Sequence, residues 1–341
     1  MDSPKISVLI PLYNRKHYIE DCINSVLIQT FQDFEIIVCD DKSIDGSAEF
    51  VAKRFSSEIS SGKLKLLRNE RNISEFPNDN RLLREATGKY VMILHSDDLF
   101  LYNALEQMYE TAEYFKADVV HAGTFLKSLE GGIIDDSHQL KVMSWENRLV
   151  KNFEIVSDEP ATRFKEWRDA DTFIDAQYNI FRREFLIDNG IFFPNWGGNP
   201  LFCLHWLMKA KIYVKTPDIF YICRDAPDSL SNDKKFLAEK VYKFIVGTAS
   251  ISEYFNNLFS SVKFFRDNPR VQYHARAIFY DRFDDFRLHR LKIYEQGITP
   301  EIHSAVERAV KENFGEQADY VTFLFHLVHC LKFKRNYQEI I

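Results

Sequence analysis

The stretch EIIVCDDKSIDGS, residues 35–47, joins a run of apolar residues to a cluster of acidic ones. Its first five residues have the continuous apolar character of a strand that is buried on both faces of a sheet. Asp40 and Asp41 end this strand, and Ser43 or Asp45 can cap the helix that we expect over 45–56. A buried strand, a polar turn and a helix form the repeating unit of an α/β fold with a parallel sheet.

The same pattern recurs through the first 120 residues. Apolar runs predict further strands over 6–11, 63–67, 90–94 and 118–121, and helical spacing predicts helices over 16–29, 78–87 and 103–116. Alternating strands and helices predict a mainly parallel sheet, flanked by helices, with right-handed crossovers. Such sheets bind ligands beyond the carboxyl ends of their strands, where this chain has three polar clusters, Tyr13-Asn14, Asp40-Asp41 and Ser96-Asp97-Asp98.

The second half of the chain has a different pattern. We expect helices over 180–189 and 201–211, and short strands over 212–214 and 219–223. From about residue 234 onward we expect only helices, with a break near Asn268-Pro269. The chain has 30 phenylalanines, many of them in this half, and the predicted organisation is an α/β domain over 1–230 followed by an all-helical extension over 231–341.

Composition excludes several classes of protein. Acidic residues outnumber basic ones by 50 to 44 and the formal net charge is −6, so we do not expect a nucleic-acid partner. Five cysteines without a CxxC pair argue against a disulfide framework or a structural zinc site and favour a reducing compartment. No run of 18 apolar residues is present, and we expect a cytoplasmic protein, at most associated with the inner face of the plasma membrane.

The two acidic clusters suggest specific chemistry. A carboxylate of Asp40 or Asp41 can accept the imide N–H of uracil or a ribose hydroxyl, although a helix cap in a solvated turn explains the same residues. Asp97 and Asp98 supply the oxygen ligands that Mg²⁺ and Mn²⁺ prefer, and a cation there could neutralise a diphosphate. The alternative is a turn before the helix that begins near Asn103. Taken singly, each cluster leaves both interpretations open.

Three motifs in order make the pattern more specific. ISVLIPLYN, CDDKSIDGS and ATGKYVMILHSDD resemble the family 2 glycosyltransferases of the GT-A fold. The resemblance is continuous over about 1–125 and weaker over 176–232. It implies a Rossmann-like GT-A domain over 1–230, with a nucleotide-sugar-binding half over 1–125 and an acceptor half over 126–230.

The resemblance also assigns residues to a donor site. Asp97 and Asp98 match the last two positions of the family's Asp-x-Asp-Asp metal motif, whose first position is His95 here, and we expect Asp98 to be the direct ligand of Mn²⁺ or Mg²⁺. The family's Ala-Arg-Asn segment reads Asn78-Asp79-Asn80, so its arginine is missing. The residues expected to contact the nucleotide sugar are Pro11, Tyr13, Asn14, Asp40, Asp41, Asn80, Asp97 and Arg224.

The catalytic base of the family is the aspartate of a Gly-Glu-Asp-like motif just before a helix. Here that motif reads Gly197-Gly198-Asn199-Pro200, and an asparagine amide cannot accept a proton at neutral pH. Three interpretations stay open. The base is a nearby carboxylate such as Asp171 or Asp175, or another group or water takes the proton, or the chain binds a donor without efficient turnover.

The resemblance implies a metal-dependent, inverting glycosyltransferase that moves a sugar from a nucleotide donor, with UDP expected, to a glycan or lipid-linked glycan acceptor. The expected setting is the assembly of bacterial capsule or lipopolysaccharide. Because of Asn199, the alternative is a non-catalytic or impaired nucleotide-sugar-binding domain that acts as a scaffold. We expect the aromatic C-terminal helices to pack on the domain or to form a homodimer, with peripheral membrane contact through Lys332, Lys334 and Arg335 as the alternative.

Overall fold

The computed structural model describes residues 3–128, 153–169, 176–195, 198–224, 251 and 253–279, together with residues 304, 308 and 311. Asp171, Asp175 and the basic residues at 332–335 lie outside these ranges. The chain forms two compact units. One consists of residues 1–193 and 198–227 and holds the sheet, and the other consists of residues 194–197 and 228–341.

The sheet of the first unit has nine strands in the order β3-β2-β1-β4-β8-β6-β9-β5, with β7 paired to β9. Strands β3, β2, β1 and β4 run parallel, and β8, which is antiparallel to both of its neighbours, joins them to the parallel pair β6 and β9. The strands are β1 (Ile6–Leu12), β2 (Phe34–Asp40), β3 (Leu64–Arg68), β4 (Tyr90–Ile93), β5 (Leu99–Phe100), β6 (Val119–Ser128), β7 (Glu154–Val156), β8 (Asn179–Arg182) and β9 (Tyr213–Arg224).

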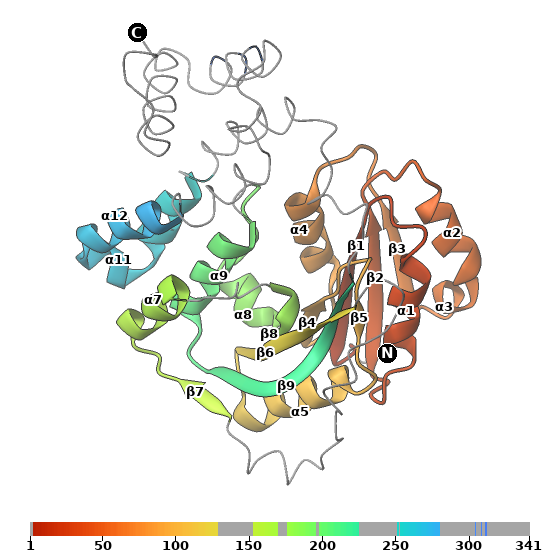
Figure 1. Ribbon diagram of the computed structural model, residues 1–341, viewed down its shortest axis with the longest axis horizontal. Helices are drawn as coiled ribbons and strands as arrows, with labels where there is room; N and C mark the ends of the chain where they lie inside the picture. Colours follow the sequence, from red (N-terminus) through yellow and green to blue (C-terminus); the bar gives the residue numbers. More distant parts are fainter. Residues whose placement is uncertain are drawn as a thin grey trace. The chain divides into compact units, whose positions relative to one another are not determined.

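Helices cover both faces of the parallel strands. Figure 1 shows α4 on one side of β1–β3 and α1, α2 and α3 on the other. The helices of this unit are α1 (Ile19–Leu27), α2 (Ser47–Arg54), α3 (Ser56–Ser60), α4 (Glu75–Glu85), α5 (Ala104–Phe115), α7 (Pro160–Asp169), α8 (Arg183–Asp188) and α9 (Gly198–Lys209), with a short 3-10 turn, η1 (Ala176–Tyr178).

Three expectations about the elements were wrong in detail. The helix expected over 45–56 is divided into α2 and α3 at Phe55, a buried residue. The start of the helix expected over 180–189 is strand β8, because Ile180 and Phe181 pair with β4 and β6 and are buried in the sheet. The two short strands expected over 212–223 are one strand, β9, whose pairing with β6 shifts register twice.

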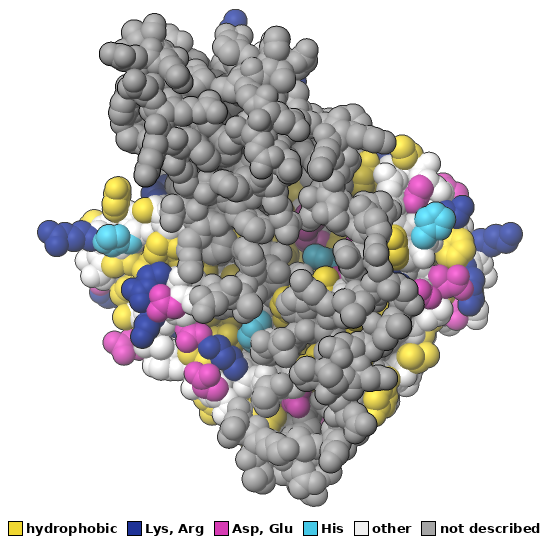
Figure 2. Space-filling view, in the orientation of Figure 1, with side chains coloured by type: hydrophobic (Ala, Val, Ile, Leu, Met, Phe, Trp, Pro, Cys, Tyr) yellow, Lys and Arg dark blue, Asp and Glu magenta, His cyan; other side chains and the backbone are white. Residues whose placement is uncertain are grey.

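The described surface of the chain carries charges of both signs. On the face seen in Figure 2, acidic and basic side chains are interspersed with apolar ones, and neither sign forms a broad patch on the described part of that face. This distribution agrees with the small net charge of −6.

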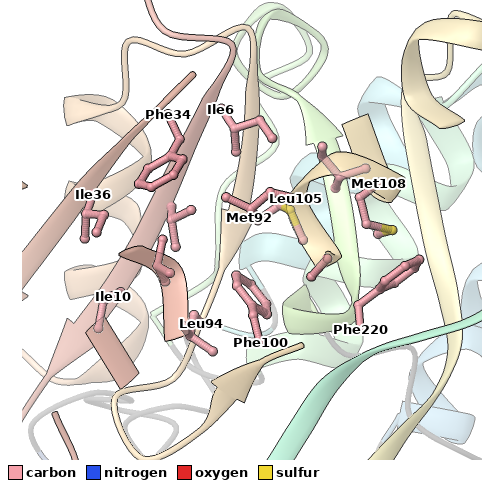
Figure 3. Close-up of a cluster of buried hydrophobic side chains, with 14 of the residues drawn as sticks. Ile6, Ile10, Phe34, Ile36, Met92, Leu94, Phe100, Leu105, Met108 and Phe220 are labelled. Carbon is pink, nitrogen blue, oxygen red and sulfur yellow. The ribbon is translucent and has the colours of Figure 1, made fainter. Parts of the chain in front are cut away.

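The parallel strands are buried on both faces, as their apolar runs predicted. Alternate residues such as Ile6 and Ile10 of β1 join a core cluster with Leu105 and Met108 of α5 (Figure 3). Leu9 lies outside this cluster and is equally buried, because α4 packs against β1 and β2. This two-sided burial explains why β1, β2 and β4 read as continuous apolar runs rather than alternating ones.

Gly88 precedes β4 and lies directly against β1. Its backbone N–H donates to Ser7 Oγ over 2.8 Å, and a Cβ at this position would lie 2.6 Å from Ser7 N and 2.8 Å from Ile6 C. We expect Gly88→Ala to lower the free energy of unfolding by about 2 kcal/mol, because strand backbone has to move to make room. Urea denaturation measures this loss. In Gly62→Ala, where a Cβ meets nothing within 4 Å, only the positive φ of 77° opposes the change, and a loss as large as that of Gly88→Ala would contradict the steric explanation.

The described part of the second unit is helical. Residues 253–261, α11 (Lys263–Asp267) and α12 (Pro269–Ile278) form helices, with the expected break at Asn268-Pro269. Phe255 contacts Phe259 and Phe279, and Phe259 contacts Phe265, with ring centroids 4.8–5.6 Å apart. All four rings are buried, so these phenylalanines form a core within their own unit. No described helix combines the length and the apolar character needed to cross a bilayer.

Candidate active site

Several strands end at one edge of the sheet. Because β1, β2 and β4 run parallel, their carboxyl ends lie together, and the loops after them contain the three polar clusters noted in the sequence. Strand β5 directly follows Asp98 and pairs with the last part of β9, which brings Tyr221 and Arg224 to the same edge. Residues from four parts of the chain therefore meet where ligands bind in such folds.

The loop after β1 is tied to the loop after β2. Asn14 has a left-handed φ of 52°, its backbone N–H donates to Ser43 Oγ over 2.9 Å, and its Oδ1 accepts from the Ile44 N–H over 2.9 Å. Pro11 is opposite Cys39 in the pairing of β1 with β2. The backbone at Leu12 accepts from the N–H of Asp41, so Tyr13 follows next to the acidic pair. The structure thus brings Pro11, Tyr13, Asn14, Asp40 and Asp41 together.

Asp40 is completely buried at the end of β2. Its carboxylate accepts from the Ser43 N–H over 3.2 Å and lies 3.3 Å from Arg68 Nε. Burial raises the pKa of Asp40 above its usual value, against the opposing effects of the Ser43 hydrogen bonds and the Arg68 charge. This carboxylate shapes the turn after β2.

Asp41 organises the segment that leads into α4. Its side chain accepts from Asn69 Nδ2 over 2.7 Å, from the Ile73 N–H over 2.8 Å and from the Ser74 N–H over 2.9 Å. Asn69 also donates to Asn78 Oδ1 over 2.9 Å, which joins this network to α4 itself. Asp41 is therefore a structural centre of the connection from β3 to α4, a role that its place after a strand did not reveal.

Asp98 is held from β9. Its Oδ2 accepts from Tyr221 Oη over 2.7 Å, and its Oδ1 accepts from the Arg224 backbone N–H over 2.9 Å. Asp98 is buried, and burial, together with the neighbouring charge of Asp97, raises its pKa, while His95, Tyr221 and the Arg224 N–H act in the opposite direction. The Asp97 carboxylate pairs with Arg15 Nε over 3.0 Å. The two carboxylates are thus oriented by different parts of the chain.

Arg224 is a clamp between three elements. Its guanidinium donates to the Asp97 carbonyl oxygen, to Asp21 Oδ2 over 3.0 Å and to the Tyr18 carbonyl oxygen over 2.9 Å, and it lies over the Tyr18 ring at 5.2 Å from the centroid. It therefore joins the end of β9 to the loop after β4 and to the start of α1. Strand β9 ends in the residues Tyr221-Ile222-Cys223-Arg224. Tyr221 and Arg224 both hold the Asp97-Asp98 turn.

The strands and loops that build this edge match a known family. The model of the family described as glycosyl transferase family 2 matches residues 7–189, more than half of the chain. The chain belongs to glycosyl transferase family 2. The family resemblance drawn from the three motifs is confirmed, and the family is one of glycosyltransferases.

Curated members of the family match the first part of the chain. The Escherichia coli UDP-Glc:alpha-D-GlcNAc-diphosphoundecaprenol beta-1,3-glucosyltransferase WfgD is 38% identical over 106 residues, which cover 31% of this chain and 40% of WfgD. The glycosyltransferase GlyG of Streptococcus pneumoniae is 34% identical over 118 residues, which cover 35% of this chain and 38% of GlyG. The matches thus span about two fifths of the length of these relatives.

A solved structure extends the likeness to the whole fold. Staphylococcus aureus TarS 1-349, crystallised in complex with UDP-GlcNAc, superimposes with a TM-score of 0.58 at 19% identity, over 97% of this chain and 88% of that one. The identity is low, so this likeness concerns the fold, and the predicted GT-A fold is confirmed.

Arg224 is the family residue whose role in the fold is easiest to test. We expect Arg224→Ala to lower the free energy of unfolding by about 3 kcal/mol, since the Asp97 carbonyl oxygen and the Asp21 carboxylate lose their hydrogen bonds to Arg224 and the Tyr18 carbonyl oxygen is left with the Cys22 N–H as a donor. Urea denaturation of Arg224→Ala beside Arg224→Lys measures the effect. Lysine keeps the charge and loses the planar fork, so an intermediate loss is expected. Unchanged midpoints in both variants would contradict the clamp.

The acidic pair can be tested for its fit to a divalent cation. Among the described residues, no group of three or more His, Cys, Asp or Glu side chains is arranged to hold a metal ion. Asp97 and Asp98 supply two carboxylates, and the Asp98 oxygens, which each accept one hydrogen bond, keep a second lone pair. Mg²⁺ is commonly bound through one or two carboxylates together with substrate phosphates. These residues fit a cation whose coordination is shared with a diphosphate.

Three other positions singled out in the sequence are Asn80, Asn199 and His95, and each has a different environment in the structure. Both amide atoms of Asn80 are paired with the backbone of Phe193 over 2.8 Å, so Asn80 fixes the segment before α9. Asn199 lies in the first turn of α9, half-buried. Burial would lower the pKa of His95, but the negative charges of Glu75 and its other acidic neighbours raise it.

The sequence analysis gave no role to Arg15, Asp79 or Tyr221. Arg15 is buried between the loop after β1 and Asp97, and the signal for it was a cation directly after the PLYN segment. Asp79 is a buried acid on α4, and the signal for it was the replacement of the family's arginine.

Proposed function

We propose that this chain transfers a sugar from a nucleotide-sugar donor, with UDP as its nucleotide, to a hydroxyl of a glycan or lipid-linked glycan acceptor during the assembly of a bacterial surface polysaccharide. The observation that carries the proposal is the Asp97-Asp98 pair, which Tyr221, Arg224 and Arg15 orient beside the loops after β1 and β2. Nothing in a purely structural turn requires two carboxylates to be held in this way by residues more than 80 positions away.

The relatives support the choice of donor and acceptor. The name of WfgD specifies a UDP-sugar donor and an acceptor linked to diphosphoundecaprenol, and the TarS structure contains UDP-GlcNAc. For this chain the donor and the acceptor are proposals. The product, capsule or lipopolysaccharide, and the place of action, the inner face of the plasma membrane, are proposals as well. A homodimer through the C-terminal helices is likewise a proposal.

The proposed reaction is a single displacement with inversion. The acceptor oxygen forms a bond to the anomeric carbon, the bond from that carbon to the phosphate oxygen breaks, and its electron pair leaves with the nucleoside diphosphate. Mn²⁺ or Mg²⁺ bound by Asp98 and Asp97 would neutralise the charge of the diphosphate. Asn14, Asp40 and Asp41 shape the nucleotide side of the site, and Arg15 keeps the Asp97 carboxylate in place.

Calorimetric titration of UDP into the purified chain, with and without Mn²⁺, tests the donor half of this proposal without knowledge of the acceptor. We expect saturable binding of UDP in the presence of Mn²⁺ and much weaker binding without it, because the protein supplies only two carboxylates to the cation. GDP serves as the matched control. Binding of GDP but not UDP would replace the proposed donor, and binding of neither would contradict the proposal.

Asn199 favours a second candidate, a domain that binds the donor without turning it over. An amide at the position of the family's base cannot accept the acceptor proton. Release of UDP from UDP-glucose or UDP-GlcNAc separates the two functions, because a binding domain would take up UDP and release none from either donor.

A further inference from the structure

Among the residues that the structure describes, Asp79 is a buried carboxylate without a hydrogen-bond partner. It is 4% exposed, and neither of its side-chain oxygens accepts a hydrogen bond from any residue that the structure describes, with Oδ1 completely enclosed. A buried polar group normally has a hydrogen-bond partner, and one that lacks it destabilises the folded chain. Its retention therefore calls for a role that the folded chain alone does not explain.

The position of Asp79 on α4 places it opposite the start of α9. Phe76, Asp79 and Asn80 are three and four residues apart and so share one face of α4. Phe76 stacks on Phe193 with ring centroids 5.9 Å apart, and Asn80 pairs with the Phe193 backbone. This face of α4 therefore packs against the segment that leads to α9.

A second contact extends this packing to the first residue of α9. A Cβ at Gly198 would lie 2.0 Å from Phe76 Cζ, so the Gly198 backbone is in direct contact with that ring. The next residue is Asn199, at the position of the family's base. The face of α4 that bears Asp79 is thus the face that meets the first turn of α9.

The charges around Asp79 come from three parts of the site. They are Glu75 on α4, His95 after β4 and Asp41 after β2. Burial raises the pKa of Asp79 well above its usual value, the charges of Glu75 and Asp41 raise it further, and His95 opposes them. A carboxyl group whose pKa lies closer to the working pH is the better general base.

We propose that Asp79 is the general base of the transfer and takes the proton of the acceptor hydroxyl that Asn199 cannot take. The inference rests on the proposed function. In the step, the acceptor O–H proton moves to a carboxylate oxygen of Asp79, the acceptor oxygen bonds to the anomeric carbon, and the nucleoside diphosphate leaves with the electron pair of the broken bond. The carboxylate that relatives carry at the start of α9 is thus supplied from α4, across the Phe76 contact.

Asp79→Asn is the decisive variant, and Asp33→Asn, the same chemical change outside the site, is its matched control. Asp33 is exposed before β2 and accepts from the Lys5 N–H. Two quantities are measured for each variant: UDP binding by calorimetry with Mn²⁺, and the rate of UDP release from UDP-glucose and UDP-GlcNAc with water as acceptor. We expect Asp79→Asn to lower the release rate about 100-fold or more and to leave the affinity for UDP within about threefold. Asp33→Asn should change both by less than about threefold.

A double variant moves the carboxylate from position 79 to position 199. We expect the double variant Asp79→Asn, Asn199→Asp to release UDP at least about tenfold faster than Asp79→Asn alone, because it restores a base at the family position. Asp79→Asn should also unfold at the same temperature as the wild type or higher, since it replaces a buried group whose ionisation is penalised by burial with an amide that cannot ionise. This separates a lost base from a damaged fold.

Each remaining outcome has a separate meaning. An unchanged release rate in Asp79→Asn overturns the assignment, and an equal fall in UDP affinity and rate makes Asp79 a donor-binding residue instead. A wild-type chain that binds UDP but releases none from either donor supports the non-catalytic alternative and overturns the assignment of a base. A wild-type chain that does not bind UDP contradicts the proposed function itself.

Discussion

Asp98→Asn is expected to weaken the binding of UDP in the presence of Mn²⁺ about 100-fold, or about 2.7 kcal/mol. The substitution removes one of the two carboxylate charges offered to the cation. It also places an NH₂ group near Tyr221 Oη and the Arg224 N–H, which both donate to Asp98. The amide must turn its single oxygen toward one of these donors. The side chain therefore loses its negative charge and also the orientation in which its oxygen could bind the cation. Calorimetric titration of UDP with and without Mn²⁺ measures the effect.

The control for this variant is an aspartate at the other end of the same sheet. Asp33 is exposed, precedes β2 and accepts from the Lys5 N–H, so Asp33→Asn makes the same chemical change far from the proposed cation. We expect it to bind UDP as the wild type does. In the absence of Mn²⁺, Asp98→Asn and wild type should bind UDP equally weakly. An undiminished Mn²⁺-dependent affinity in Asp98→Asn would remove Asp98 from the metal site.

Asp41→Ala is expected to lower the free energy of unfolding by about 3–5 kcal/mol. Three donors lose their hydrogen bonds to Asp41 at once: Asn69 Nδ2, the Ile73 N–H and the Ser74 N–H. Asn69 Nδ2 keeps Asn78 Oδ1 and the Ser74 N–H keeps Asn72 Oδ1 as acceptors, whereas the Ile73 N–H loses its acceptor. These groups form the connection from β3 to α4, and the loss of the carboxylate frees the segment that positions Asn78 and the rest of that helix. The midpoint of urea denaturation measures the loss.

Asp45 provides the matched comparison for Asp41. It also accepts from backbone N–H groups, those of Lys16 and Ser47, but it is exposed at the start of α2. Asp45→Ala should therefore lower the free energy of unfolding by only about 1 kcal/mol, because its hydrogen bonds lie at an exposed site. If Asp41→Ala were as stable as the wild type and yet failed to bind UDP, Asp41 would act mainly on the nucleotide, as the family resemblance implies.

The elements of the first 125 residues could be predicted because their information is local. A strand buried on both faces must be apolar at every position, so β1, β2 and β4 are visible in the sequence as uninterrupted runs. The same logic failed at β8, since Ile180-Phe181 is as apolar as the first turn of a buried helix and is too short to show a period. Only its pairing with β4 and β6 makes it a strand.

The position of the candidate site could be predicted from the sequence, but the hydrogen bonds of its side chains could not. Parallel strands bring their carboxyl ends to one edge, so the order of strands and polar clusters along the chain was enough to place Asn14, Asp41 and Asp98 together. Which donors their oxygens accept depends on residues far along the chain. Asp98 is held by Tyr221, 123 residues later, and no local pattern encodes that contact.

The sequence by itself determined the α/β class, the family and the edge of the sheet where the chemistry lies, because these depend on hydrophobic periodicity and on short motifs. The tertiary structure decided what each polar side chain does there. It turned Asn80 and Asp41 toward the backbone of their own fold, used Arg224 as a clamp, and left Asp79 buried on α4 with no hydrogen-bond partner among the described residues. The physical reason is that hydrogen bonding and desolvation depend on which groups meet in space, and those meetings join residues that the chain holds far apart.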